Sequence, residues 1–120
     1  MKLILAGLFI LAVGTQAQWY HFPGQALGGA HDMWRAYKDM RNANWKNSDK
    51  YFHARGNYDA AQRGPGGRWI STVLSDGREL MPGNSGNGRA DSAADQEANH
   101  WGRNGGNPNR YRPKGLPQNY

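Results

Sequence analysis

Apolar positions recur at helical spacing in four separate stretches of the chain, at 19–41, 48–63, 69–81 and 90–101. Each stretch carries a polar face opposite an apolar one, as expected for an amphipathic helix. No alternating polar and apolar stretch of useful length, which would indicate a strand, occurs between them. Short breaks separate the four stretches. The pattern therefore predicts an all-α fold, an antiparallel four-helix bundle followed by an irregular C-terminal tail.

Polar or glycine-rich segments separate the predicted helices. Several Asn residues in 42–47 indicate a connection, and Ser48 is expected to cap the second helix by accepting hydrogen bonds from its free amides. Gly64-Pro65-Gly66-Gly67 is expected to break the chain firmly, and Pro82 to end the third helix. Residues 105–120 are rich in Gly, Asn and Pro without any period. This segment is expected either to cover the bundle or to stay mobile.

The first predicted helix carries the widest apolar stripe, an arc of roughly 140° at about 100° per residue. The stripe has two interpretations, bundle core or lipid-binding face, and a thin core that opens could serve as both. Pro23 lies in the first turns, where proline is tolerated, whereas Gly28-Gly29 weakens the middle of the helix. Arg35 and Lys38 would lie beside lipid headgroups. The candidate lipid-binding residues are Trp19, Phe22, Leu27, Met33, Trp34, Tyr37 and Met40.

The first 17 residues have the features of a secretory signal peptide. Lys2 precedes an apolar run at 3–13, and Thr15-Gln16-Ala17 resembles a cleavage site. The run is shorter than the roughly 20 residues of a transmembrane helix, which argues against the alternative of an uncleaved membrane anchor. We therefore expect a signal peptide at 1–17, a helical bundle domain at 18–104 and a tail at 105–120, in a secreted, extracellular protein.

The composition of the chain indicates which classes of binding partner to expect. It has 120 residues, no cysteine and a formal net charge of +6. Small secreted domains without disulfides have thin cores, so we expect stabilisation by its own copies, a lipid surface or a polyanion. A basic extracellular protein meets anionic headgroups and sulfated polysaccharides more often than DNA. The alternative is that the charge only aids solubility.

The basic residues are spread over three predicted helices without a dense cluster. Solvated faces and helix pairs such as Asp59–Arg63 explain several of them. A site for a sulfated polysaccharide is the alternative, because the reversal at 64–67 would bring two helix ends together. The candidate polyanion-binding residues are Arg63, Arg68 and Arg78.

Aromatic and basic residues alternate in 50–63, a mixture that also suits single-stranded nucleic acid. Helical spacing places Tyr51 and Tyr58 on one face, which should pack inward, whereas Lys50, Arg55 and Arg63 should point largely outward. Rings that face a core cannot stack on bases. We therefore expect no nucleic-acid partner.

Catalytic chemistry is not indicated by any motif. The His residues are scattered, and no HExxH or Cys/His spacing is present to hold a metal. The carboxylate pairs Asp32/Asp39 and Asp91/Asp95 are more typical of solvated helix faces than of acid/base dyads. We expect no catalytic residue, no metal site, no cofactor and no enzymatic activity.

The sequence contains the strings DMWRAYKDM, SDKYFHARGNYDAAQRGPGG, SDGRE, ADQEANHWGR and NPNRYRPKGLP. Together they resemble the serum amyloid A family of acute-phase apolipoproteins, over the whole mature chain. The resemblance implies a four-helix fold with a wrapped tail, secretion during inflammation, self-association and exchangeable association with high-density lipoprotein and phospholipid. It also implies binding of heparan sulfate, retinol and the outer membrane of some Gram-negative bacteria, a role in innate immunity as a chemoattractant, and an amyloid-prone N-terminal segment.

Two features depart from the family pattern. Pro23 and Gly28-Gly29 interrupt a helix that is more apolar and continuous in mammalian members, so amyloid formation by the segment from Gln18 onward should be weaker. MPGNSGNG, at 81–88, falls where other members continue the third helix, which reduces the surface that this helix can offer to lipid. The leading hypothesis is an exchangeable apolipoprotein. Its rivals are a soluble heparan sulfate- or bacteria-binding protein of innate immunity and a membrane-active antimicrobial chain.

Overall fold

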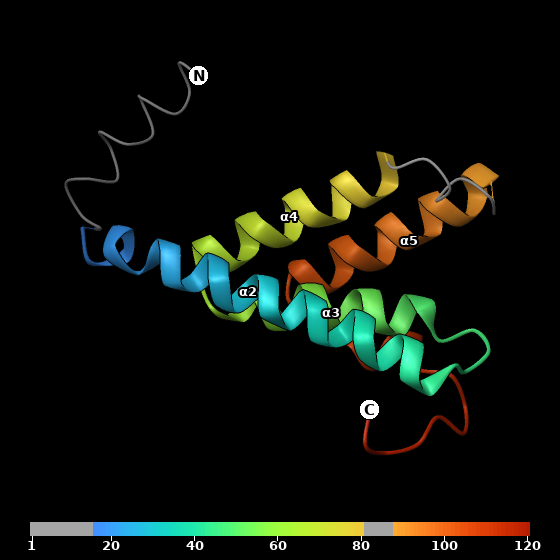
Figure 1. Ribbon diagram of the computed structural model, residues 1–120. Coiled ribbons are helices and arrows are strands. Elements are labelled where there is room, and N and C mark those ends of the chain that lie inside the picture. The colour runs from blue at the N-terminus through green and yellow to red at the C-terminus, as the bar shows by residue number, and fades with distance from the viewer. Residues whose placement is uncertain (1–15, 81–87) are drawn as a thin grey trace.

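The computed structural model describes residues 16–80 and 88–120, and these residues form a helical bundle (Figure 1). The helices are α2 (Gln16–Ala43), α3 (Asp49–Gln62), α4 (Pro65–Leu80), α5 (Gly88–Arg103) and the short 3₁₀ helix η1 (Pro108–Tyr111). No strand occurs in these two ranges, so the predicted all-α four-helix fold is confirmed. The expected signal peptide at 1–17 lies outside the described residues apart from Gln16 and Ala17, and so does Pro82.

Helices α2 and α3 run antiparallel and are joined by ion pairs at two levels. Arg63 at the end of α3 contacts Asp32 in the middle of α2, and Arg55 contacts Asp39, about two turns further along α2, at 2.7 Å. Progress along α2 therefore corresponds to moving backward along α3. This is the arrangement that a short connection between helices favours.

Helices α2 and α4 run in the same general direction, in close contact near the start of α4 and spreading apart toward their C-terminal ends (Figure 1). At one end the backbone amide of Gly66 donates a hydrogen bond to the side-chain Oε1 of Gln25, at 2.8 Å. At the other end the guanidinium of Arg78 lies 5.2 Å from the ring centre of Tyr37. The two helices thus form one side of the bundle, packed together at one end and bridged by long side chains toward the other.

Two predicted helix boundaries are wrong in detail. Ser48 precedes α3 but has helical backbone angles, and its hydroxyl donates to the carbonyl of Trp45 at 2.7 Å instead of capping the helix. The expected four-residue break reduces to Gly64, whose φ of 119° is left-handed and suits glycine. Pro65 is the first residue of α4, where its missing amide is not needed.

The main apolar core cluster lies where the C-terminal tail covers α3. Tyr51, Phe52 and Leu116 are buried together. Arg112 donates to the hydroxyl of Tyr51 at 3.0 Å and to the main-chain oxygen of Pro117 at 2.7 Å, which fixes the path of the tail. Of the two alternatives open from the sequence, the structure therefore shows a tail docked on the bundle.

Elsewhere the helices meet through small and polar side chains. Ala36, Ala54, Ala60 and Ala98 are buried, as are several serines and asparagines. Close approach makes glycine necessary in places: a Cβ on Gly29 would lie 2.8 Å from Cγ2 of Ile70. The glycine that weakens α2 in isolation is therefore required for its packing against α4.

Candidate functional site: the outer face of α2 and α4

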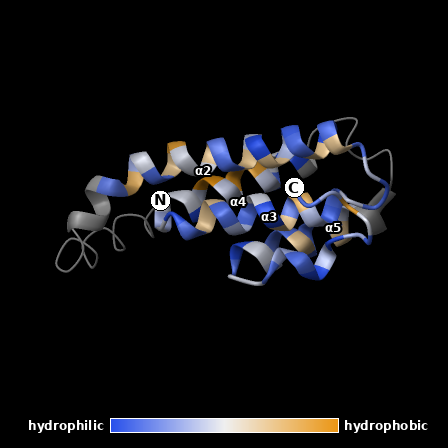
Figure 2. Ribbon diagram, turned by 90° about the horizontal axis from the view of Figure 1, so that it is seen from below, coloured by the Kyte–Doolittle hydropathy of each residue, from blue (hydrophilic) through white to orange (hydrophobic). Residues whose placement is uncertain are grey.

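Large apolar side chains are exposed along the shared surface of α2 and α4, on the outside of the bundle. Leu27 is 75% exposed, Trp34 57% and Trp69 51%. Val73 and Leu74 of α4 are exposed as well. We call these five residues the outer face. The hydropathy colouring shows apolar positions along both helices (Figure 2).

The outer face exists because α4 packs on the bundle through its small residues. Ser71 and Ser75 are buried, and the hydroxyl of Ser75 donates to Oδ1 of Asn57 on α3 at 3.3 Å. Gly67 continues the same line of small residues at spacings of four. Since these residues take the interior side of the helix, Trp69 and Val73 are left on the solvent side.

The predicted lipid-binding residues of α2 fall into two groups. Leu27 and Trp34 belong to the outer face, whereas the other described members are partly buried: Phe22 and Tyr37 lie at its border, Met33 lies against Gly56 of α3, and Met40 packs on the cluster of Tyr51, Phe52 and Leu116. The ring of Phe22 lies 5.7 Å from that of Trp69, and the ring of Tyr37 lies 6.0 Å from that of Trp34. The partly buried members are Phe22, Met33, Tyr37 and Met40. The side chain of Trp19 lies outside the described part of the structure.

The exposed residues of α4 form the apolar stripe of the third predicted helix, but they were not among the candidate lipid-binding residues. A helical stripe alone does not say whether its apolar side faces a core or the solvent. The available signal was the line of Gly67, Ser71 and Ser75, since small residues at spacings of four allow close packing of helices. Segment 81–88, where the sequence suggested a shortened third helix, lies almost entirely outside the described residues.

The three candidate polyanion-binding residues do not form one cluster. Arg63 and Arg68 lie at the junction of α3 and α4, whereas Arg78 lies near the far end of α4 beside Tyr37. Arg68 donates to the carbonyl of Arg103 at 2.7 Å and to the side chain of Asn104 at 2.6 Å. Arg68 therefore satisfies acceptors at the C-terminal end of α5.

Arg63 is hydrogen-bonded to a buried carboxylate. Its Nε and Nη2 atoms lie 2.5 and 3.0 Å from the two oxygens of Asp32, which is only 3% exposed. These hydrogen bonds raise the pKa of the Arg63 guanidinium. The expected pair of Arg63 with Asp59 is replaced by this longer-range pair. The expectation that Asp32 and Asp39 are solvated is wrong, because both carboxylates face α3 and are bound by arginines.

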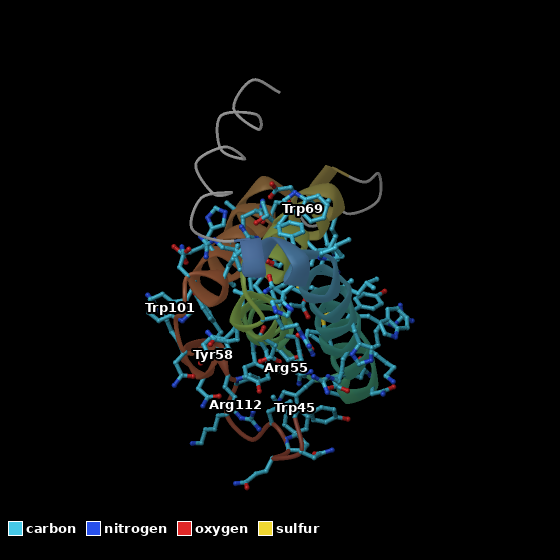
Figure 3. All side chains as sticks on the ribbon, turned by 90° about the vertical axis from the view of Figure 1, so that its left-hand side faces the viewer. Trp45, Arg55, Tyr58, Trp69, Trp101 and Arg112 are labelled. Carbon is cyan, nitrogen blue, oxygen red and sulfur yellow. The ribbon has the colours of Figure 1, made fainter. Side chains whose placement is uncertain are left out.

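The aromatic residues of 50–63 are oriented as the sequence indicates, since Tyr51 is buried and Tyr58 partly buried. The basic residues depart from their expected outward positions. Lys50 pairs with Asp95 of α5 at 3.1 Å, and the Arg55 guanidinium turns back to Asp39 on α2, as Arg63 does to Asp32. Figure 3 shows the side chains of this helix from the end of the bundle.

A buried polar network joins α3, α4 and α5. Nε and Nη2 of Arg103 donate to Oδ1 of Asn57 at 3.2 and 3.0 Å, and Nδ2 of Asn57 donates to Asn99 at 2.9 Å. Burial lowers the pKa of the Arg103 guanidinium. Sequence patterns did not reveal this network. It replaces the apolar contacts that an ordinary bundle core would contain.

Residues 16–80 and 88–120 lack two further features. No group of three or more His, Cys, Asp or Glu residues there could hold a metal ion. In the same ranges, no helix combines the length and apolarity needed to cross a bilayer.

Comparison with known proteins identifies the family. The family model described as serum amyloid A protein matches residues 20–120. The chain is 60% identical to the serum amyloid A protein of Canis lupus familiaris and 60% identical to serum amyloid A-1 of Oryctolagus cuniculus, over the full length of both chains. It is 60% identical to serum amyloid A-3 of Mus musculus, over 94% of this chain and 93% of that protein. The chain therefore belongs to the serum amyloid A family of acute-phase proteins.

Proposed function

We propose that this protein is a secreted, exchangeable apolipoprotein of high-density lipoprotein that binds lipid through the outer face of α2 and α4. The observation that carries the proposal is the exposure of Leu27, Trp34, Trp69, Val73 and Leu74 on adjacent helices. Large exposed apolar patches on soluble proteins commonly mark interaction sites.

The exposed area suits reversible binding. Withdrawing five half-exposed side chains from water supplies roughly 4–8 kcal/mol, taking half of the usual burial energy for each. The loss of translational and rotational freedom on association reduces this gain. The remainder supports attachment that exchanges between particles, which is the behaviour of a peripheral apolipoprotein rather than a permanent anchor.

The polar interior supports binding without complete unfolding. Because the outer face is already exposed, lipid can be contacted by the folded bundle. Polar groups such as Asn57 and Arg103 can keep their mutual hydrogen bonds during this contact.

Vesicle binding by a Trp34→Asp variant tests the proposal. Trp34 is largely exposed, so the variant should fold, but a carboxylate in place of the indole should lower affinity for neutral phosphatidylcholine vesicles by about tenfold or more. The matched control is Gln118→Asp, which places the same carboxylate at an exposed position of the tail, away from α4 (Figure 1).

The two variants should differ clearly in vesicle co-sedimentation. Equal losses for both, or no binding by the unmodified protein, would contradict the proposal. Binding of heparin that falls steeply with salt, together with indifference to neutral vesicles, would favour the polyanion-binding alternative.

A further inference from the structure

We infer that the outer face prefers lipid surfaces that carry anionic phospholipids, through a basic end formed by Lys38, Arg41 and Arg78. The inference rests on the proposed function and adds to it a preference for one class of lipid headgroup. Its basis is the position of charges around the outer face.

Two guanidinium groups from different helices converge on one aromatic ring at this end. The guanidinium carbon of Arg41 lies 5.9 Å from the ring centre of Tyr37, and that of Arg78 lies 5.2 Å from it. Arg41 also donates to the Tyr37 hydroxyl at 3.2 Å. The ring of Trp34 lies next to Tyr37, at 6.0 Å. Positive charge is thus held directly beside the exposed indole of the outer face.

The charges of α2 are sorted between its two sides. Its acidic residues within the described side chains are Asp32 and Asp39, and both point to α3, where Arg63 and Arg55 bind them. The residues that α2 leaves exposed include several bases. These are Lys38, Arg41 and Arg35, the last of which also pairs with Asp32 at 3.2 Å.

One exposed acidic residue, Asp49, lies next to the basic end. Asp49, at the start of α3, lines a shallow hollow of about 480 Å³ together with Arg41 and Trp45. No ion pair joins Asp49 to Arg41 within the described residues, so the Arg41 guanidinium keeps its charge available to a headgroup.

Lipid fits this surface better than a sulfated polysaccharide. A polysaccharide would satisfy the cations but would leave Leu27 and Trp34 in water. A lipid surface accepts the apolar side chains in its acyl region while phosphate oxygens meet the bases at the level of the headgroups. The interleaving of Trp34 with Lys38 and Arg41 therefore points to an anionic phospholipid monolayer or bilayer.

The test compares affinity for phosphatidylcholine vesicles with affinity for the same vesicles containing a minor fraction of phosphatidylglycerol. The unmodified protein should bind the mixed vesicles about tenfold more tightly at low salt, and high salt should remove most of this preference. In the double variant Lys38→Gln/Arg41→Gln the ratio of the two affinities should fall close to one.

The matched control is the double variant Arg110→Gln/Lys114→Gln. It removes one arginine and one lysine from exposed positions of the tail, on the opposite side of the bundle from α4 (Figures 1 and 3). This control should keep the preference of the unmodified protein. Circular dichroism of all proteins establishes that the helices are intact.

Each other outcome separates the inference from the proposed function. Binding to both vesicles without preference would overturn the inference and leave the proposed function standing. Failure to bind either vesicle would overturn the proposed function itself. Equal loss of preference in both double variants would show that net charge acts without a basic end. Loss of heparin binding in Lys38→Gln/Arg41→Gln, with an unchanged lipid ratio, would assign these cations to a polysaccharide instead.

Discussion

Aromatic side chains are used in opposite ways on the tail-covered side of α3 and on the outer face of α2 and α4. Beneath the tail, Tyr51 and Phe52 are buried with Leu116. On the outer face, Trp34 and Trp69 leave more than half of their surface in water. Because apolar groups stabilise a fold only when they are removed from water, we infer that the tail side supplies much of the stability and the outer face is reserved for binding.

Truncating one aromatic residue on each side should show the largest difference in how much the two sides contribute to the free energy of unfolding. Phe52→Ala should lower the free energy of unfolding by about 3–5 kcal/mol, because it opens a cavity in the main apolar cluster. Trp69→Ala should lower it by about 1 kcal/mol, because the indole is half exposed and its ring packs beside that of Phe22. Urea denaturation followed by circular dichroism measures both.

A milder change covers the case in which Phe52→Ala fails to fold. Leu116→Ala removes the tail residue of the same cluster, and it should still cost more stability than Trp69→Ala. If Trp69→Ala were the most destabilising of the three, the assignment of stability to the tail side would be wrong.

Between the tail-covered side and the outer face, the helices are held by close contact of their backbones. Two glycines of α4 test this. A Cβ on Gly67 would overlap the carbonyl oxygen of Ala60, so Gly67→Ala should push α4 from α3 and lower stability by about 1–3 kcal/mol. Gly77 has no heavy atom within 4 Å of a built Cβ. Gly77→Ala should therefore raise stability by about 0.5–1 kcal/mol through helix propensity.

Thermal denaturation of these two glycine variants should give shifts of opposite sign. Shifts of the same sign would mean that helix propensity, rather than the separation of α3 and α4, decides the effect at Gly67. The comparison needs no lipid, so it examines the interior independently of the proposed function.

The sequence allowed the helices to be predicted because helical periodicity is a local property. All four helices occur where the pattern places them, and α4 differs mainly by starting at Pro65. The direction of the apolar face of α4 was not predictable from its own stripe. It depends on Ser71 and Ser75 finding partners in the interior, which is a property of neighbouring helices.

The charge pairs and the position of the tail could not be predicted from local patterns either, because they depend on residues far apart in the sequence. Arg63 could pair with Asp59 one turn away, but burial of Asp32 makes the more distant partner the stronger one. Arg112 and Leu116 lie in a segment without periodicity, and only contacts with Tyr51 and Phe52 reveal their role. Among the candidate site residues, Leu27 and Trp34 were recognised and Trp69 was missed.

The smallest expected effect concerns Asp59, a partly buried carboxyl on α3 beside the Asp32–Arg63 pair. Burial raises its pKa above the ordinary 3.8, the charge of Arg55 opposes this shift, and the charge of Asp32 adds to it. The folded protein therefore holds this proton more tightly than the unfolded chain. Stability from this group is present below pH 3.8 and is lost as the pH rises through the folded-state pKa.

Asp59→Asn removes the buried charge, so the variant should be modestly more stable than the unmodified protein at neutral pH. The difference should shrink when both proteins are unfolded at a pH below 3.8, where the carboxyl is protonated in both states. The control Asp49→Asn changes an exposed carboxyl in the first turn of the same helix. It should give no gain at neutral pH, because that charge is solvated and lies at the positive end of the helix dipole. A gain for Asp59→Asn that did not depend on pH would have to come from packing, and α3 would then tolerate charge in its interior as readily as on its surface.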